Sequence, residues 1–145
     1  MNARLFLFAG PLLAGLLAGP AGAAADGDPV LIQSGERSYL VYCSACHGTD
    51  GRGNGPVAPV LRTPPADLTR IAANRAGTFP AAEIADYIDG RADVAAHGPR
   101  EMPVWGRVFA RPVMDRSTGE EVARGQLWVL VEYLRSLQQD DEPSP

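Results

Sequence analysis

The chain has 145 residues, with 13 basic and 17 acidic side chains, a net charge of −4 and no lysine. No run of basic residues resembles a nucleic-acid-binding patch, so we expect no nucleic-acid partner. Without its apolar N-terminal segment the chain keeps about 120 residues, which is enough for one domain but short for two.

The first 25 residues predict export from the cytoplasm. Arg4 precedes an apolar stretch over 5–17, and small residues follow up to Ala23 and Ala25. This order is typical of a secretory signal peptide cleaved after Ala23 or Ala25. An uncleaved membrane anchor is the alternative, because residues 5–25 are about long enough to span a bilayer. We expect residues 1–25 to be removed and residues 26–145 to form one periplasmic domain.

A helix beginning near Ser34 is expected to lead into Cys43-Ser44-Ala45-Cys46-His47. Cys43, Cys46 and His47 stand at i, i+3 and i+4, so one helical turn presents all three on the same side. This pattern predicts covalent haem attachment, with two thioethers from the cysteines and His47 ligating the iron. A redox-active cysteine pair or a disulfide is the alternative. A zinc site would need a fourth ligand, and the only other histidine is His97.

The middle of the chain predicts loops around one short helix. Glycines and prolines fill residues 48–65, which excludes a regular helix or strand interior there. A helix is expected over Ala81–Asp89, where Ile84 and Ile88 share one face and Gly90 can end it. Residues 97–111 contain further glycines and prolines and are expected to form a loop.

The last helix is expected over Gly125–Leu137, where leucines and valine form a broad apolar stripe at helical spacing. Residues 117–119, Ser-Thr-Gly, indicate a turn before it. Residues 138–145 are acidic and contain proline, so a disordered tail is expected. No alternating strand pattern is present, and the chain is therefore predicted to be all-α with long loops.

A haem iron that only transfers electrons usually has a second axial ligand opposite the histidine. Met102 is the favoured candidate, because Pro103 stiffens the loop that presents its sulfur, and Met/His is a common electron-transfer ligation. His97 would give a bis-histidine site, Met114 is more simply explained by core packing, and an open iron is the remaining possibility.

With these motifs, residues 35–137 resemble the class I c-type cytochromes. The resemblance implies a small cytochrome c-like fold of three to five helices with long loops wrapped around one covalently bound haem c. It also implies that Gly35 and Tyr39 meet Leu130 and Tyr133 where the first and last helices cross.

The resemblance extends to the haem surroundings. It implies that a proline carbonyl after the haem motif accepts a hydrogen bond from His47; Pro59 fits that position and Pro56 is the fallback. Leu61 and Trp105 are expected to be further cofactor-binding residues.

The leading hypothesis is a periplasmic electron carrier, rather than an enzyme, that meets redox proteins transiently. A cytochrome subunit of a periplasmic or membrane-bound dehydrogenase or oxidase is the second hypothesis, with membrane contact through that complex or an uncleaved anchor. A haem enzyme or gas sensor with an open iron is the third. The lysine ring that mitochondrial relatives use for docking is absent, so the identity of the partner cannot be inferred from the family.

Overall fold

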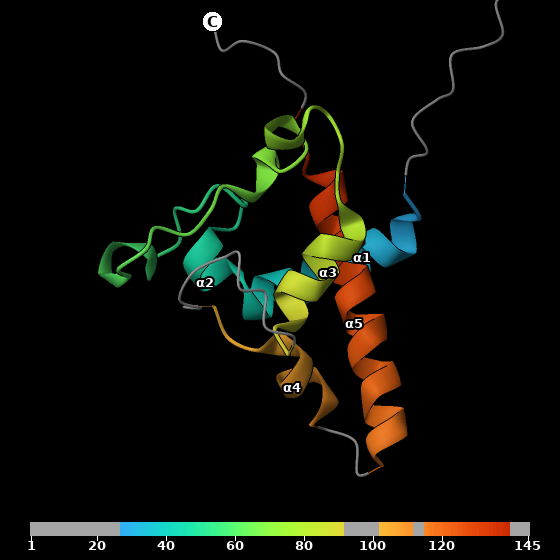
Figure 1. Cartoon of the computed structure of the whole chain (residues 1–145). Helices are drawn as coiled ribbons and strands as arrows, with labels where there is room; N and C mark the ends of the chain where they lie inside the picture. The colour runs from blue at the N-terminus through green and yellow to red at the C-terminus, as the bar shows by residue number, and fades with distance from the viewer. Residues whose placement is uncertain (1–26, 92–101, 112–114, 140–145) are drawn as a thin grey trace, which may run out of the picture.

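The computed structural model describes residues 27–91, 102–111 and 115–139. These residues form helices joined by long loops, with no strand among them, which confirms the predicted all-α fold (Figure 1). The α-helices are α1 (Pro29–Tyr42), α2 (Ser44–His47), α3 (Ala81–Asp89), α4 (Trp105–Ala110) and α5 (Arg116–Ser136). Short 3-10 turns lie between α2 and α3 at Ala58–Val60, Leu68–Arg70 and Ala73–Arg75.

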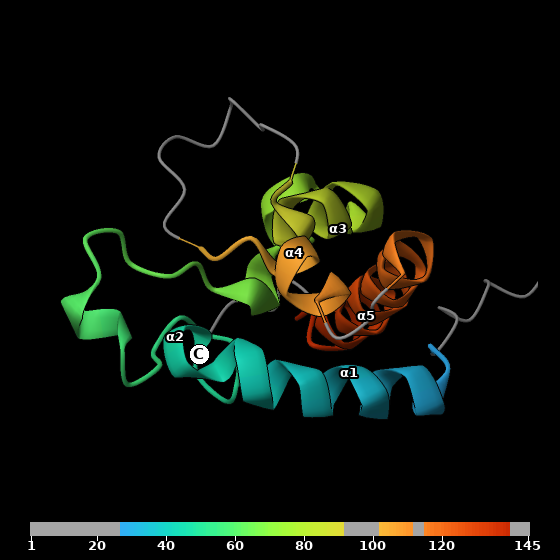
Figure 2. The same cartoon turned by 90° about the horizontal axis from the view of Figure 1, so that it is seen from below.

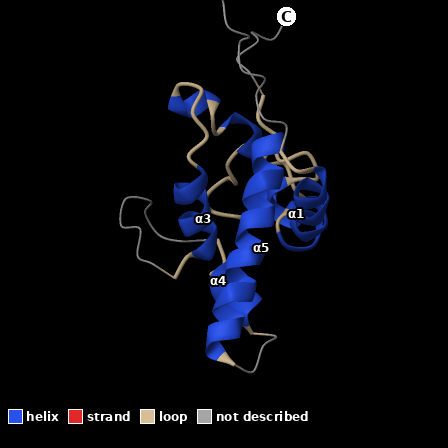
Figure 3. Ribbon diagram, turned by 90° about the vertical axis from the view of Figure 1, so that its right-hand side faces the viewer, coloured by secondary structure: helices blue, strands red, loops and turns tan. Residues whose placement is uncertain are grey.

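Helix α5 is the element on which the others pack. Figure 3 shows it running the length of the molecule with α1 on one side and α3 on the other, and α4 packs on it as well. Its buried stripe includes Leu127, Leu130, Val131 and Leu134, as the helical spacing predicted.

Helix α5 begins nine residues earlier than the sequence pattern indicated. Asp115 caps it, because its carboxylate accepts hydrogen bonds from the backbone N–H of Thr118 at 2.9 Å and from the Ser117 hydroxyl at 2.6 Å. The turn expected at Ser117–Gly119 is therefore the first turn of the helix. Gly119 is buried there against the carbonyl of Ala110, so a residue that suggested a break instead allows α4 and α5 to approach.

Helix α1 begins at Pro29, not near Ser34. Asp28 caps it by accepting from the N–H of Val30 at 2.8 Å, and proline is well suited to the first helical position. Gly35 is buried where α1 crosses α5, next to Val129 and Tyr133. The ring of Tyr39 is fully buried and lies 5.2 Å from that of Tyr133, centroid to centroid. The predicted helix crossing is therefore present, with the backbone of Val129 as the closest neighbour of Gly35.

Helix α3 has the predicted bounds and ends at Gly90, whose φ of 69° is left-handed. The prediction of a loop throughout 97–111 was wrong for its second half, where residues 105–110 form α4. Phe109 is 5% exposed and packs in the core with α5, so burial of the apolar side chains outweighs the helix-breaking signal of Pro103 and Gly106. Residues 92–101 and 112–114 lie outside the described residues.

The expectation of a disordered tail was wrong for its first two residues. Gln138 and Gln139 are held by hydrogen bonds to the loop that follows the haem motif, and the described residues end at 139. The predicted signal segment, residues 1–25, also lies outside the described part. Within residues 27–91, 102–111 and 115–139, no helix has the length and apolarity needed to cross a bilayer.

Gly35→Ala is expected to destabilise the protein by about 1–3 kcal/mol, because the added methyl group would lie 2.7 Å from Cβ of Tyr133 and closer still to the Val129 carbonyl. Denaturant unfolding of the haem-loaded protein measures this loss.

Gly125→Ala is the matched control. Gly125 belongs to α5 and a Cβ there meets nothing within 4 Å, so this change should stabilise by about 0.5–1 kcal/mol through helix propensity alone. Equal effects of the two substitutions would contradict a tight crossing at Gly35.

Candidate haem site

The sequence motif forms one turn of helix at the end of α1. Cys43 is the residue between α1 and α2, and Cys46 and His47 belong to α2, which continues from α1 with a change of direction (Figure 2). Both cysteines are free thiols and half-buried. The backbone N–H groups of Cys46 and His47 both donate to the carbonyl of Cys43, at 3.1 and 3.0 Å. Cys43, Cys46 and His47 thus stand within one turn of helix.

The glycine-rich loop after the motif packs its backbone against α2. Gly53, Gly55 and Val57 donate their N–H groups to the carbonyls of His47, Cys46 and Ala45 at 2.8, 3.1 and 2.9 Å. These bonds satisfy carbonyls that a four-residue helix cannot pair internally. A Cβ on Gly55 would lie 2.7 Å from the carbonyl carbon of Cys46, so glycine is required for this approach.

The carbonyl that accepts from His47 belongs to Ala66. Nδ1 of His47 lies 3.1 Å from the Ala66 oxygen, and because a carbonyl only accepts, Nδ1 carries the proton. The prediction of Pro59 as acceptor was therefore wrong, and so was its fallback Pro56. Pro59 belongs to an exposed 3-10 turn, whereas the loop returns to α2 only at residues 65–68, where Leu68 N–H donates to the Gly51 carbonyl at 2.7 Å.

Burial sets the protonation of the motif. It lowers the pKa of His47, with the Ala66 hydrogen bond acting weakly in the opposite direction, so the ring is neutral at pH 7 and its Nε2 keeps a free lone pair. Burial, and then the neighbouring Cys46, raise the pKa of Cys43 to about 12. A redox-active Cys-x-x-Cys pair has the opposite property, a lowered thiol pKa.

The alternatives to haem find little support at this turn. Among the described residues, no group of three or more histidine, cysteine, aspartate or glutamate side chains is placed to hold a metal ion, so a zinc site has no ligand set there. Two thiols one turn apart, beside a neutral imidazole with a fixed tautomer, are the donors that covalent haem attachment needs.

A buried tyrosine fixes the end of the haem-motif turn. The Tyr39 hydroxyl donates to the carbonyl of Gly48 at 2.6 Å, and Gly48 follows His47 directly. Desolvation raises the pKa of Tyr39, so the hydroxyl stays protonated and remains a donor. The residue that packs α1 on α5 therefore also holds the haem motif.

An aromatic cluster brings the Met102 segment to the haem motif. The ring of Tyr42, which precedes Cys43, lies 5.5 Å from Trp105 and 5.2 Å from Phe109, both edge to face. Trp105 and Phe109 are stacked at 5.8 Å. Met102 is half-buried, packs against the core and stands three residues before Trp105. Residues about 60 positions apart in sequence thus meet at one place.

The structure describes only some of the remaining residues that the sequence predicted for the haem site. Leu61 is half-buried at the end of the exposed 3-10 turn, and no hydrogen bond links that turn to His47 among the described residues. His97 and Met114, the alternatives to Met102, lie outside the described residues.

Sequence reasoning missed a glutamine that fastens α5 to the Ala66 loop. Gln138 donates from Nε2 to the carbonyl of Leu68 at 2.8 Å and accepts from the N–H of Ala72 at 2.8 Å. The N–H of Gln139 donates to the carbonyl of Thr69 at 3.0 Å. From the sequence alone, these residues could only be recognised as polar, which suggested a disordered end after the last helix.

The fold and this turn define a small all-α cytochrome of the c type. The family model described as "Cytochrome C oxidase, cbb3-type, subunit III" matches residues 30–134. The chain belongs to this family of class I c-type cytochrome domains, and its cofactor is covalently bound haem c. No curated protein and no solved structure matches the chain.

Gln138→Ala is expected to cost about 1–3 kcal/mol, because it leaves the Ala72 N–H without its acceptor and removes two donated bonds. It should also let the Ala66 loop move, so that the His47 Nδ1 proton exchanges faster with solvent. Denaturant unfolding and NMR of the imidazole N–H measure the two effects.

Gln126→Ala is the control, because Gln126 also lies on α5 but bonds to the Ser38 side chain on α1. It should lower stability without changing exchange at His47. Unchanged His47 exchange in Gln138→Ala would show that the glutamine does not position the loop.

Proposed function

We propose that this cytochrome is an exported electron-transfer protein whose haem is attached through Cys43 and Cys46 and ligated by His47 and Met102. One observation carries the proposal: the turn that presents both thiols and an oriented imidazole is tied by Tyr42 to the segment that follows Met102. The bound haem supplies a one-electron ferrous–ferric couple.

The residues of the chain orient this cofactor from both sides. His47 donates its Nδ1 proton to Ala66, which leaves Nε2 as the ligating nitrogen and raises its basicity. Met102 offers a thioether from a bend next to Pro103, whose fixed φ restrains the backbone there. With both axial positions occupied by the chain, the site is suited to passing electrons and not to binding a substrate.

The periplasm is the location that the proposal assigns. Residues 1–25 have the pattern of an export signal, and haem is joined to Cys-x-x-Cys-His motifs outside the bacterial cytoplasm. Transient docking through a small interface near the haem edge is the mode of action expected of a carrier.

A second candidate is a subunit of an oxidase complex. The family description favours it, because it names subunit III of a cbb3-type cytochrome c oxidase. Purification of the native protein from membranes in a mild detergent distinguishes the two. Co-purification with oxidase subunits at constant stoichiometry would support the subunit, and recovery as a single chain in the soluble fraction would support the free carrier.

Met102→Ala tests the axial ligand. The variant should keep its covalent haem but lose the weak far-red absorbance band of methionine ligation. Its reduction potential should fall by a sizeable part of the range of about 0.8 V that axial ligands span, because a thioether favours ferrous iron.

Met114→Ala and His97→Ala are the controls, since each removes one alternative ligand. Both should keep the far-red band and the potential of the parent protein. Persistence of the band in Met102→Ala, together with its loss in Met114→Ala, would assign the ligand to Met114 instead.

A further inference from the structure

The structure gathers four arginines around one hollow. The hollow has a volume of about 500 Å³ and is lined by Arg91, Arg107, Arg111 and Arg116, together with Ala110, Gly119 and Glu120. The sequence contains no basic run, and these arginines are brought together only by the fold. The fold brings together residues from the end of α3, from α4 and from the start of α5.

Positive charge exceeds negative charge at this hollow. Two carboxylates neutralise part of it: Asp89 binds Arg91 through two hydrogen bonds of 2.7 Å, and Glu120 lies 3.9 Å from Arg116. In the described part of the chain, no carboxylate lies within ion-pair distance of Arg107 or Arg111. Two guanidinium groups thus face the hollow region without an anionic partner from the described residues, in a protein with a net charge of −4.

The side chain of Arg91, which lines the hollow, is held in place by its neighbours. Gly106 of α4 lies against the Asp89–Arg91 pair, and a Cβ there would be 2.6 Å from both Asp89 oxygens. Arg91 is therefore fixed by its carboxylate on one side and by α4 on the other. Arg116 occupies the first position of α5, where the helix dipole disfavours a cation, and its exposed side chain ends 3.9 Å from Glu120.

We propose that this hollow binds a small oligoanion carrying phosphoryl groups. Guanidinium groups form paired, charge-assisted hydrogen bonds with phosphate oxygens, and several converging arginines suit a ligand with more than one negative charge. A volume of about 500 Å³ is within the range of small-molecule sites. The phosphoryl groups can come from a soluble oligophosphate or from the headgroup of an anionic lipid, and the experiment separates the two sources.

The test uses the full haem-loaded protein at low ionic strength, titrated with pyrophosphate in a calorimeter. A parallel arm measures sedimentation with vesicles containing an anionic phospholipid and with neutral vesicles. Binding of pyrophosphate alone identifies a soluble ligand, and binding to anionic vesicles with weak pyrophosphate affinity identifies a headgroup. Both results support the site. No saturation up to about 10 mM pyrophosphate, together with no vesicle binding, overturns it.

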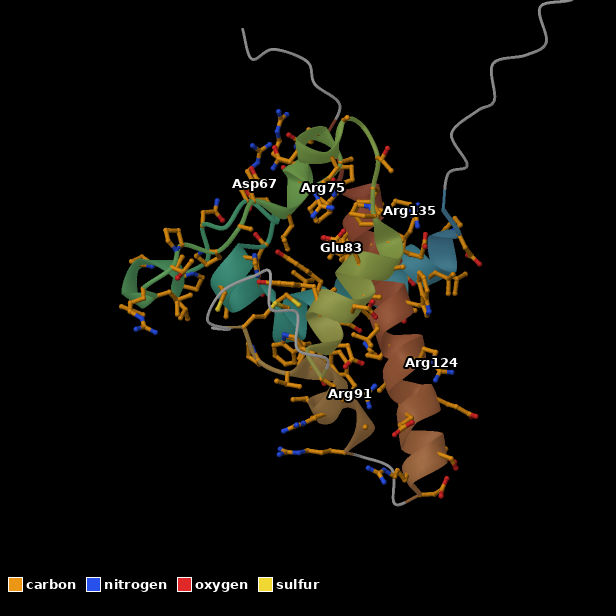
Figure 4. The ribbon with its side chains drawn as sticks, viewed as in Figure 1. Asp67, Arg75, Glu83, Arg91, Arg124 and Arg135 are labelled. Atoms are coloured by element: carbon orange, nitrogen blue, oxygen red, sulfur yellow. The ribbon has the colours of Figure 1, made fainter. Side chains whose placement is uncertain are left out.

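The variant Arg107→Gln/Arg111→Gln should weaken binding by about tenfold for each arginine removed. Its control, Arg37→Gln/Arg124→Gln, removes the same charge from α1 and from the side of α5 that faces away from α4 (Figure 4). The control should weaken binding less than about threefold. Equal weakening by both double variants would show a general charge effect and overturn the site. An unchanged haem spectrum in both variants separates this result from any failure of the electron-transfer proposal.

Discussion

The close approach of α1 and α5 at Gly35 is the constraint on which the remaining structure depends. It allows Tyr39 to reach the ring of Tyr133 in the core, and the same Tyr39 hydroxyl reaches the carbonyl that follows His47. Packing of the two longest helices and orientation of the haem motif are therefore not independent. A disturbance of the crossing would be transmitted to the carbonyl of Gly48, which follows His47, through a single buried side chain.

The end of α5 makes the second connection between the core and the haem site. Gln138 joins the last residues of that helix to Leu68 and Ala72, while Ala66, two residues before Leu68, accepts the His47 proton. The loop that holds the imidazole is thus fastened just after Ala66, by Leu68 to the Gly51 carbonyl and by Gln138, which follows α5. A long loop rich in glycine and proline can be well ordered when its backbone groups are paired in this way.

Local signals explain what was predictable from the sequence. The Cys43–His47 turn and helix Ala81–Asp89 follow from spacing within a few residues, and both are as expected. The helix crossing at Gly35 could be predicted only from the family resemblance. Long-range packing decided the rest: α4 forms because Phe109 is buried by α5, and the histidine acceptor is Ala66 because the loop returns to α2 there. Neither fact has a signature in the neighbouring residues.

All 13 basic side chains of this protein are arginines, among them those of the ion pairs Arg75–Glu83 and Arg91–Asp89 and those around the hollow beside α4. A guanidinium does not lose its proton below pH 12. The pattern of cationic patches is therefore constant over any pH that a cell compartment experiences. Changes in surface potential with acidity must then come chiefly from groups other than the arginines, above all the carboxylates. Acetylation and other lysine chemistry also have no side chain to modify in this protein.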